Sequence, residues 1–125
     1  MAIRALVAGH GTFAGGMVSA VEQISGRGES LAAMSNTGLG LDDIQRTLKD
    51  LLDDSGARVI FTDLPAGSCT MAARRLMRER PDLLLITGVN LSLLLDFAMQ
   101  DDADAVVAAR KALDRGRASM VAHGA

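Results

Sequence analysis

Hydrophobic and polar positions along this chain fall into blocks that predict strands and helices in turn. A short apolar run at 3–8, closed by glycine, is typical of a buried parallel strand. From Thr12 onward the apolar residues recur every three or four positions, which predicts a helix that ends near Gly26. A weaker strand is predicted at 30–34, and a loop containing two glycines follows it.

The same alternation continues through the rest of the sequence. The remaining predicted elements are a helix at 41–56, a strand at 58–63, a helix from Ser68 or Cys69 to about Arg80, a strand at 83–87, a short apolar helix at 91–99 and a last helix from Asp101 to Arg115. The tail at 116–125 is expected either to be frayed or to form a short edge strand, paired within the chain or between subunits.

Strand and helix alternate four times without a long linker or an internal repeat, which predicts one α/β domain over residues 1–125. The expected architecture is a doubly wound, mainly parallel four-stranded sheet with helices on both faces. In the common strand order 2-1-3-4 the first and third strands are neighbours. An extra C-terminal edge strand is an option left open by the tail.

Composition and charge exclude several classes of protein. Hydrophobic residues make up 49% of the chain and charged residues 22%, as in an ordinary globular domain. There is no Trp or Tyr, the net charge is −2 and no basic stripe occurs, so nucleic-acid binding is not expected. The single cysteine, the lack of a signal peptide and the lack of a long apolar segment predict a cytoplasmic protein.

Three loops with small or polar residues follow predicted strands: "GHGT", "DLPAGS" and "TGVN". Because the carboxyl ends of parallel strands meet at one edge of a sheet, His10 and Asp63 are expected side by side although they are 53 positions apart. A carboxylate that accepts a hydrogen bond from one imidazole nitrogen leaves the other nitrogen free to act as a nucleophile. The glycines on either side of His10 are expected to leave the ring accessible to a large partner.

A second feature suits the same chemistry. The backbone N–H groups of Gly67 and Ser68, at the start of a predicted helix, would bind an anion. Nucleophile, carboxylate and anion site together describe phosphoryl transfer through phosphohistidine. Ser68 suits the role of a plain helix N-cap equally well. No metal or organic cofactor is indicated.

Three further polar or reactive features have simpler interpretations. Cys69 is expected to be a small buried residue, with a reactive thiol at a helix N-terminus as the alternative. Asn90 is expected to cap the helix that follows it, and "NTGLG" is interpreted as a turn.

The sequence resembles the enzyme IIA domain of the mannose-type sugar phosphotransferase system over nearly its whole length. The stretches that carry the resemblance are, in order, "AGHGTFAGGM", "EQISG", "FTDLPAGS" and "GVNLSLLLDFAM". Three positions depart from the family pattern: Ala66 stands in place of a glycine, and Cys69 and Ser92 each stand in place of a proline.

The resemblance implies a phosphoryl carrier. His10 would accept the phosphoryl group from phospho-HPr and pass it to an EIIB subunit of a membrane EIIC/EIID complex, with Asp63 orienting the ring. Gly67 and Ser68 would receive the phosphoryl group. Family members are commonly dimers, some through a C-terminal strand, so a cytoplasmic homodimer, peripheral to the permease, is expected. The sugar is set by other subunits.

Other functions use the same features. The phosphotransferase subunit of a phosphoenolpyruvate-dependent dihydroxyacetone kinase has a similar fold and histidine, but "GHG" and "GVNL" favour the sugar system. A regulatory IIA domain would keep the same histidine. A hydrolase that uses Ser68 is disfavoured because "AGSCT" lacks the second glycine of a nucleophile elbow. A non-catalytic flavodoxin-like binding module would leave the pairing of His10 with Asp63 unexplained.

Overall fold

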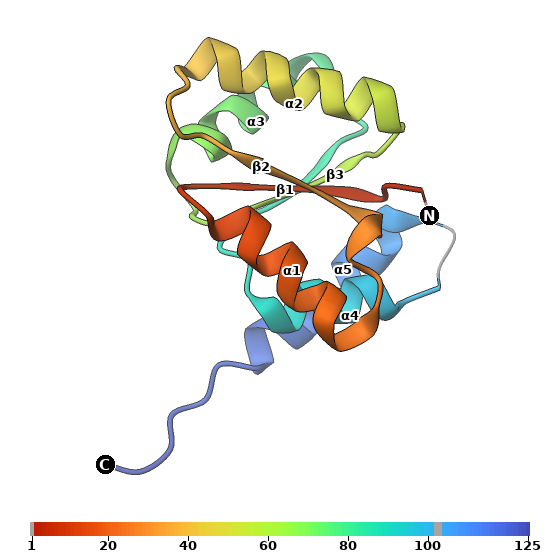
Figure 1. The fold of residues 1–125 in the computed structure, drawn as a ribbon, viewed down its shortest axis with the longest axis vertical. Coiled ribbons are helices and arrows are strands. Elements are labelled where there is room, and N and C mark those ends of the chain that lie inside the picture. Colours follow the sequence, from red (N-terminus) through yellow and green to blue (C-terminus); the bar gives the residue numbers. More distant parts are fainter. Residues whose placement is uncertain (1, 102–103) are drawn as a thin grey trace.

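In the computed structural model, four parallel strands form the centre of the molecule (Figure 1). Strand β1 (Ala5–Gly9) lies between β2 (Leu31–Ser35) and β3 (Val59–Thr62), and β4 (Leu84–Ile86) pairs with β3 on its other side. The order β2-β1-β3-β4 confirms the predicted sheet. The switch in strand order, and with it the expected site, therefore lies between β1 and β3.

The helices cover both faces of the sheet, as predicted. They are α1 (Phe13–Ser25), α2 (Leu41–Ser55), α3 (Ser68–Glu79), α4 (Leu91–Met99) and α5 (Ala105–Ala118), with a short 3-10 helix η1 (Gly28–Ser30) before β2. Helices α2 and α3 pack on one face, and α1, α4 and α5 pack on the other (Figure 1).

The structure describes residues 2–101 and 104–125, and the last helix differs from its prediction. Helix α5 begins at Ala105 and not at Asp101, which is not helical; the predicted positions 102 and 103 lie outside the described residues. Asp104 caps α5, because its side chain accepts a hydrogen bond from the N–H of Val106 at 2.9 Å.

Two apolar cores, one on each face, explain why the strand sequences are almost continuously hydrophobic. All five residues of β1 are buried. Leu6 packs towards α2 and α3, whereas Val7 packs towards α1, α4 and α5, since successive strand residues face opposite sides. On the second face Phe61 and Phe97 meet edge to face, with ring centroids 5.1 Å apart.

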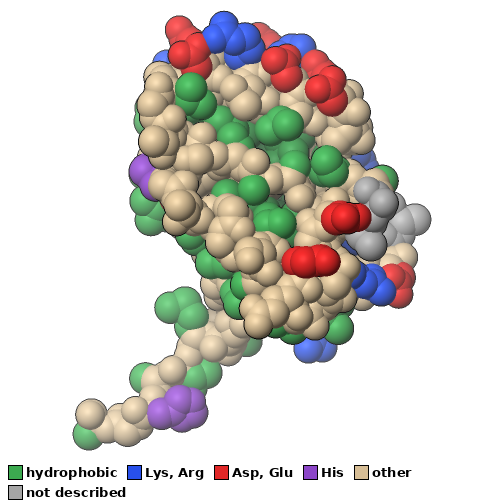
Figure 2. All heavy atoms as spheres, in the orientation of Figure 1, with side chains coloured by type: hydrophobic (Ala, Val, Ile, Leu, Met, Phe, Trp, Pro, Cys, Tyr) green, Lys and Arg blue, Asp and Glu red, His purple; other side chains and the backbone are tan. Residues whose placement is uncertain are grey.

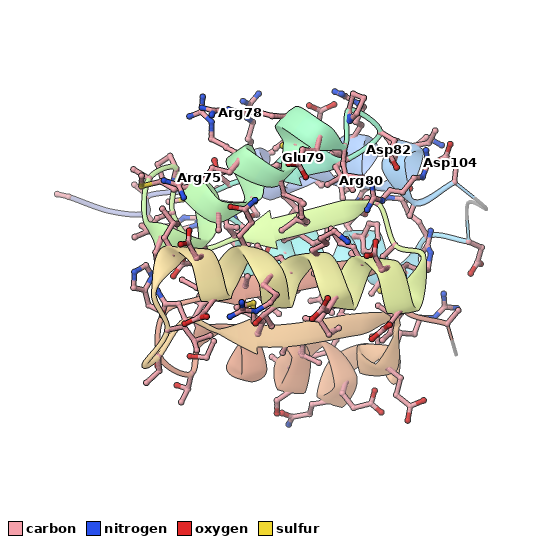
Figure 3. All side chains as sticks on the ribbon, turned by 90° about the horizontal axis from the view of Figure 1, so that it is seen from above. Arg75, Arg78, Glu79, Arg80, Asp82 and Asp104 are labelled. Atoms are coloured by element: carbon pink, nitrogen blue, oxygen red, sulfur yellow. The ribbon has the colours of Figure 1, made fainter. Side chains whose placement is uncertain are left out.

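Helix α3 has a polar outer side that faces solvent. Figure 3 shows Arg75 and Arg78 on this side, and Arg80 beside Asp82 just after the helix ends. The Arg80 guanidinium lies 3.2 Å from a carboxylate oxygen of Asp82 and 3.2 Å from one of Asp53 in α2. The pair of Arg80 with Asp53 thus connects α2 to the C-terminal end of α3.

The C-terminal tail forms no strand within this chain. Residues 120–125 carry no regular secondary structure, and the tail runs away from the body (Figure 1). Met120 and Val121 are 81% and 65% exposed. Of the two alternatives for the tail, the edge strand paired within the chain is thus absent, because the tail reaches no strand of its own sheet. No helix among the described residues is long and apolar enough to cross a membrane.

Candidate functional site

His10 and Asp63 meet at the carboxyl edge of the sheet, where each is the first residue after its strand. Asp63 Oδ2 lies 2.7 Å from the Nδ1 atom of His10 and also accepts a hydrogen bond from the His10 backbone N–H at 2.9 Å. The two residues are 53 positions apart, so only the pairing of β1 with β3 brings them together. The predicted contact is confirmed.

The charge of Asp63 selects the tautomer of the neutral His10 ring. Partial burial favours a higher pKa for Asp63, but the hydrogen bonds from the His10 backbone and ring outweigh this effect and hold its pKa below the ordinary value. Asp63 is therefore an ionised carboxylate at neutral pH and can only accept hydrogen bonds. In the neutral ring, the proton then lies on Nδ1 of His10 and Nε2 carries the free lone pair.

The His10 ring is open to solvent while its anchor is not. The His10 side chain is 51% exposed and that of Asp63 is 12% exposed. A histidine is visible on the surface of the body in Figure 2, apart from the one on the tail. An exposed ring held by a partly buried carboxylate is accessible to another macromolecule while its orientation is kept.

The glycines beside His10 each meet a local requirement of the backbone. Gly9 is buried, and a Cβ atom there would lie 2.9 Å from Asp63 Oδ2 and 2.8 Å from Phe13 Cδ1. Gly9 therefore lets Asp63 approach the backbone. Gly11 has open space around it but a φ of +53°, so this position requires the left-handed conformation that glycine adopts freely.

The loop after β3 passes beside the free edge of the His10 ring. Gly67 has a φ of +139°, and a Cβ atom there would lie 3.3 Å from Cε1 and 3.9 Å from Nε2 of His10. Gly67 is also the N-cap of α3, and no side chain caps that helix. Within the described residues, the first-turn N–H groups of α3 therefore have no capping side chain, and the helix begins beside the His10 ring.

Ser68 is the first residue of α3 and not its N-cap, which corrects the capping interpretation. Its Oγ accepts a hydrogen bond from Asn36 Nδ2 at 2.8 Å. Asn36 belongs to "NTGLG", which was interpreted as a turn alone, and it directly follows β2. Its position after the strand next to β1 is the signal that could have placed it at this edge.

Two buried threonines hold the loop that carries Asp63. Thr70 Oγ1 donates to the Leu64 carbonyl at 2.6 Å and lies 2.7 Å from Thr62 Oγ1. Thr62 is the last residue of β3, and Thr70 lies in the first turn of α3. The loop between them is thus fixed at both ends. Neither threonine lies in a sequence motif that would have predicted this contact.

Cys69 and Asn90 have the expected structural roles. Cys69 is 1% exposed, and burial together with the charge of Asp63 raises its pKa to about 11, so it is a buried thiol and not a reactive one. Asn90 Oδ1 accepts from the N–H of Leu93 at 3.0 Å and caps α4. Its Nδ2 donates to the Gly116 carbonyl at 2.9 Å, which ties α4 to α5. In the described part of the chain, no cluster of three or more His, Cys, Asp or Glu side chains suits a metal ion.

Comparison with known proteins finds a matching family model and several structures with the same fold. Residues 4–113 match the family model EIIA-man, described as "PTS system fructose IIA component". The chain is similar in structure to the mannose/sorbose-specific IIA subunit of the phosphotransferase system from Enterococcus faecalis, with a TM-score of 0.82, 18% identity and coverage of 100% of this chain and 97% of that one.

Two further solved structures share the fold. The phosphotransferase system component EIIA from Streptococcus agalactiae has a TM-score of 0.86 and 22% identity, with 96% of each chain covered. The PTS IIA protein associated with the fucose utilization operon from Streptococcus pneumoniae has a TM-score of 0.81 and 22% identity, with 98% of this chain and 96% of that chain covered. No curated protein sequence matches the chain.

Proposed function

We propose, from the premise that this chain belongs to the EIIA-man family of phosphotransferase-system IIA components, that it receives a phosphoryl group on His10 from phospho-HPr and passes it to an EIIB subunit. The observation that carries this proposal is the contact of 2.7 Å between His10 Nδ1 and Asp63 Oδ2 on an otherwise exposed ring. In the neutral ring, this contact leaves Nε2 as the unprotonated nitrogen.

The transfer needs no proton to leave the site. The Nε2 lone pair of His10 attacks the phosphorus of the donor, a new N–P bond forms, and the bond between phosphorus and the donor breaks with its electrons staying on the donor. The phosphorylated ring keeps its proton on Nδ1 and gains positive charge. Asp63 is ionised and already hydrogen-bonded to Nδ1, so it stabilises that charge.

Gly67 and Ser68 are proposed to hold the phosphoryl oxygens. Gly67 lies against the edge of the ring that carries Nε2, and the uncapped N-terminus of α3 begins there. Its N–H groups and the helix dipole favour negative charge at this point. Hydrogen-bond donors that point at the negatively charged phosphoryl oxygens would stabilise the transition state of the transfer and so lower its barrier.

The proposed function also implies the partners and the cellular location of the protein. The donor and acceptor are themselves proteins, which agrees with a reactive ring that is 51% exposed. We place the protein in the cytoplasm, where it would meet phospho-HPr and the EIIB subunit of a membrane EIIC/EIID complex, and we expect it to act as a homodimer. The transported sugar would be selected by the membrane subunits.

Reconstituted phosphorylation tests the proposal. The protein is incubated with enzyme I, HPr and labelled phosphoenolpyruvate, alongside His10→Ala, Asp63→Ala and, as the matched control, His123→Ala in the exposed tail. We expect an acid-labile, base-stable label that is absent from His10→Ala, slower in Asp63→Ala and unchanged in His123→Ala. Label that persists in His10→Ala, or no label on the wild type with competent donors, would contradict the proposal.

A further inference from the structure

Asn36 connects the loops that follow three neighbouring strands. Its backbone N–H donates to the Gly9 carbonyl at 3.1 Å, so it is attached to the residue before His10. Its carbonyl accepts from the N–H of Leu39 at 3.0 Å, which closes the turn after β2. Its side-chain Nδ2 donates to Ser68 Oγ at 2.8 Å across the top of β1. Asn36 thus links the β2 loop to both sides of the candidate site.

The direction of the last hydrogen bond controls what Ser68 can do. A hydroxyl group has one proton to donate and two lone pairs to accept with. The amide nitrogen of Asn36 is a donor only, so it occupies a lone pair of Ser68 Oγ and cannot take its proton. Within residues 2–101 and 104–125, the Ser68 hydroxyl proton has no acceptor. The proton is therefore available to a ligand.

We propose that Asn36 is a positioning residue for phosphoryl transfer: it holds Ser68 as a hydrogen-bond donor to the phosphoryl group on His10. The inference rests on the proposed function and adds to it a residue that does not touch the phosphoryl group. Ser68 adjoins Gly67, which lies beside Nε2 of His10, so a hydroxyl fixed there is next to the transferred group. Without Asn36, the Ser68 side chain would be free to rotate between solvent and the site.

A pair of substitutions separates positioning from simple support of the loop. Asn36→Ala removes the donor, whereas Asn36→Asp keeps the shape of the side chain but turns it into an acceptor that takes the Ser68 proton. We expect Asn36→Ala to slow phosphorylation of His10 by phospho-HPr about threefold to tenfold, as the loss of one ordinary hydrogen bond predicts. Asn36→Asp should slow the reaction at least as much.

The decisive measurement is a double-mutant cycle with Ser68→Ala. If Asn36 acts through Ser68, Asn36→Ala has no further effect on the rate once Ser68 is alanine. Thr37→Ala, in the same loop, is the control and should transfer at the wild-type rate. Thermal melting of each variant verifies that the fold is retained. The change in melting temperature should not correlate with the change in phosphorylation rate.

The outcomes distinguish this inference from the function on which it rests. If the wild type takes no label on His10, the proposed function fails and the role of Asn36 fails with it. If the wild type is labelled but both Asn36 variants react at the wild-type rate, only the role of Asn36 is refuted. It is also refuted if Asn36→Ala slows the reaction equally with and without the Ser68 hydroxyl.

Discussion

Asp63 Oδ2 accepts two hydrogen bonds from the same residue, one from the ring and one from the backbone of His10, at 2.7 and 2.9 Å. The backbone bond fixes the carboxylate against the end of β1, and the ring bond then fixes the imidazole against the carboxylate. The orientation of the ring therefore depends on the sheet itself and not on packing around an exposed side chain.

The charge of Asp63, and not only its shape, is expected to matter for transfer. Asp63→Asn keeps the volume and an oxygen that can accept from Nδ1, but it removes the negative charge opposite the phosphorylated ring. Because hydrogen bonds to charged groups contribute about 1.5–3 kcal/mol, we expect phosphorylation of His10 to slow by at least about tenfold. Initial rates with labelled phospho-HPr measure this, and an Asp63→Asn protein as fast as the wild type would rule it out.

Stability should depend on pH through the same carboxylate. The pKa of Asp63 in the folded state lies below its ordinary value of about 3.9. Its ionisation therefore stabilises the fold above that pH, and this stabilisation is lost as the pH falls through the lower folded-state pKa. In urea unfolding, the free-energy difference between the wild type and Asp63→Asn should shrink below about pH 4. A difference that stays constant down to pH 2 would contradict this.

Gly9 should tolerate no side chain. A Cβ atom there would approach Asp63 Oδ2 and Phe13 Cδ1 to less than 3 Å, so we expect Gly9→Ala to destabilise the fold by about 1–3 kcal/mol and to slow phosphorylation. Gly15→Ala is the matched control, because it lies in α1 with nothing within 4 Å of its Cβ position. That substitution should stabilise the helix by about 0.5–1 kcal/mol. Thermal melting compares the two, and equal effects would count against the packing explanation.

Cys69 is expected to be unreactive while the protein is folded. With a pKa of about 11, its thiolate fraction at pH 8 is a few hundredfold lower than that of an ordinary thiol, and its side chain is 1% exposed. Alkylation by iodoacetamide should therefore proceed only as fast as the protein opens and should accelerate in urea. Rapid alkylation in native buffer would show that the thiol is accessible.

Most of the fold could be predicted because each apolar block fits only one type of secondary structure. The run that became β1 is buried on both faces and bounded by glycine, and the apolar spacing of α2 puts Ile44, Leu48 and Leu52 into the core. The contact of His10 with Asp63 followed from strand order alone. The tail was harder, because Met120 and Val121 suit a strand by residue type, whereas pairing depends on an available sheet edge.

Asn36 and the role of Gly9 could not be predicted from local patterns. The hydrogen bond from Asn36 to Ser68 spans 32 positions and depends on a side-chain conformation above β1. The close approach of Gly9 to Asp63 depends on the register of β1 against β3, in which Ala8 pairs with Thr62. In a sequence, a glycine indicates only that the backbone is conformationally free. The assembled sheet is needed to show that Asp63 and Phe13 lie against the Cβ position of Gly9.

Because β2, β1 and β3 pair side by side, the site forms only when all three strands have assembled. Asn36, His10 and Asp63 each follow a different strand, and a slip of one residue in any strand would turn its last side chains to the other face. A nascent chain released before β3 would hold the histidine but no carboxylate to orient it. The oriented ring of His10 therefore exists only in a chain whose third strand has joined the sheet.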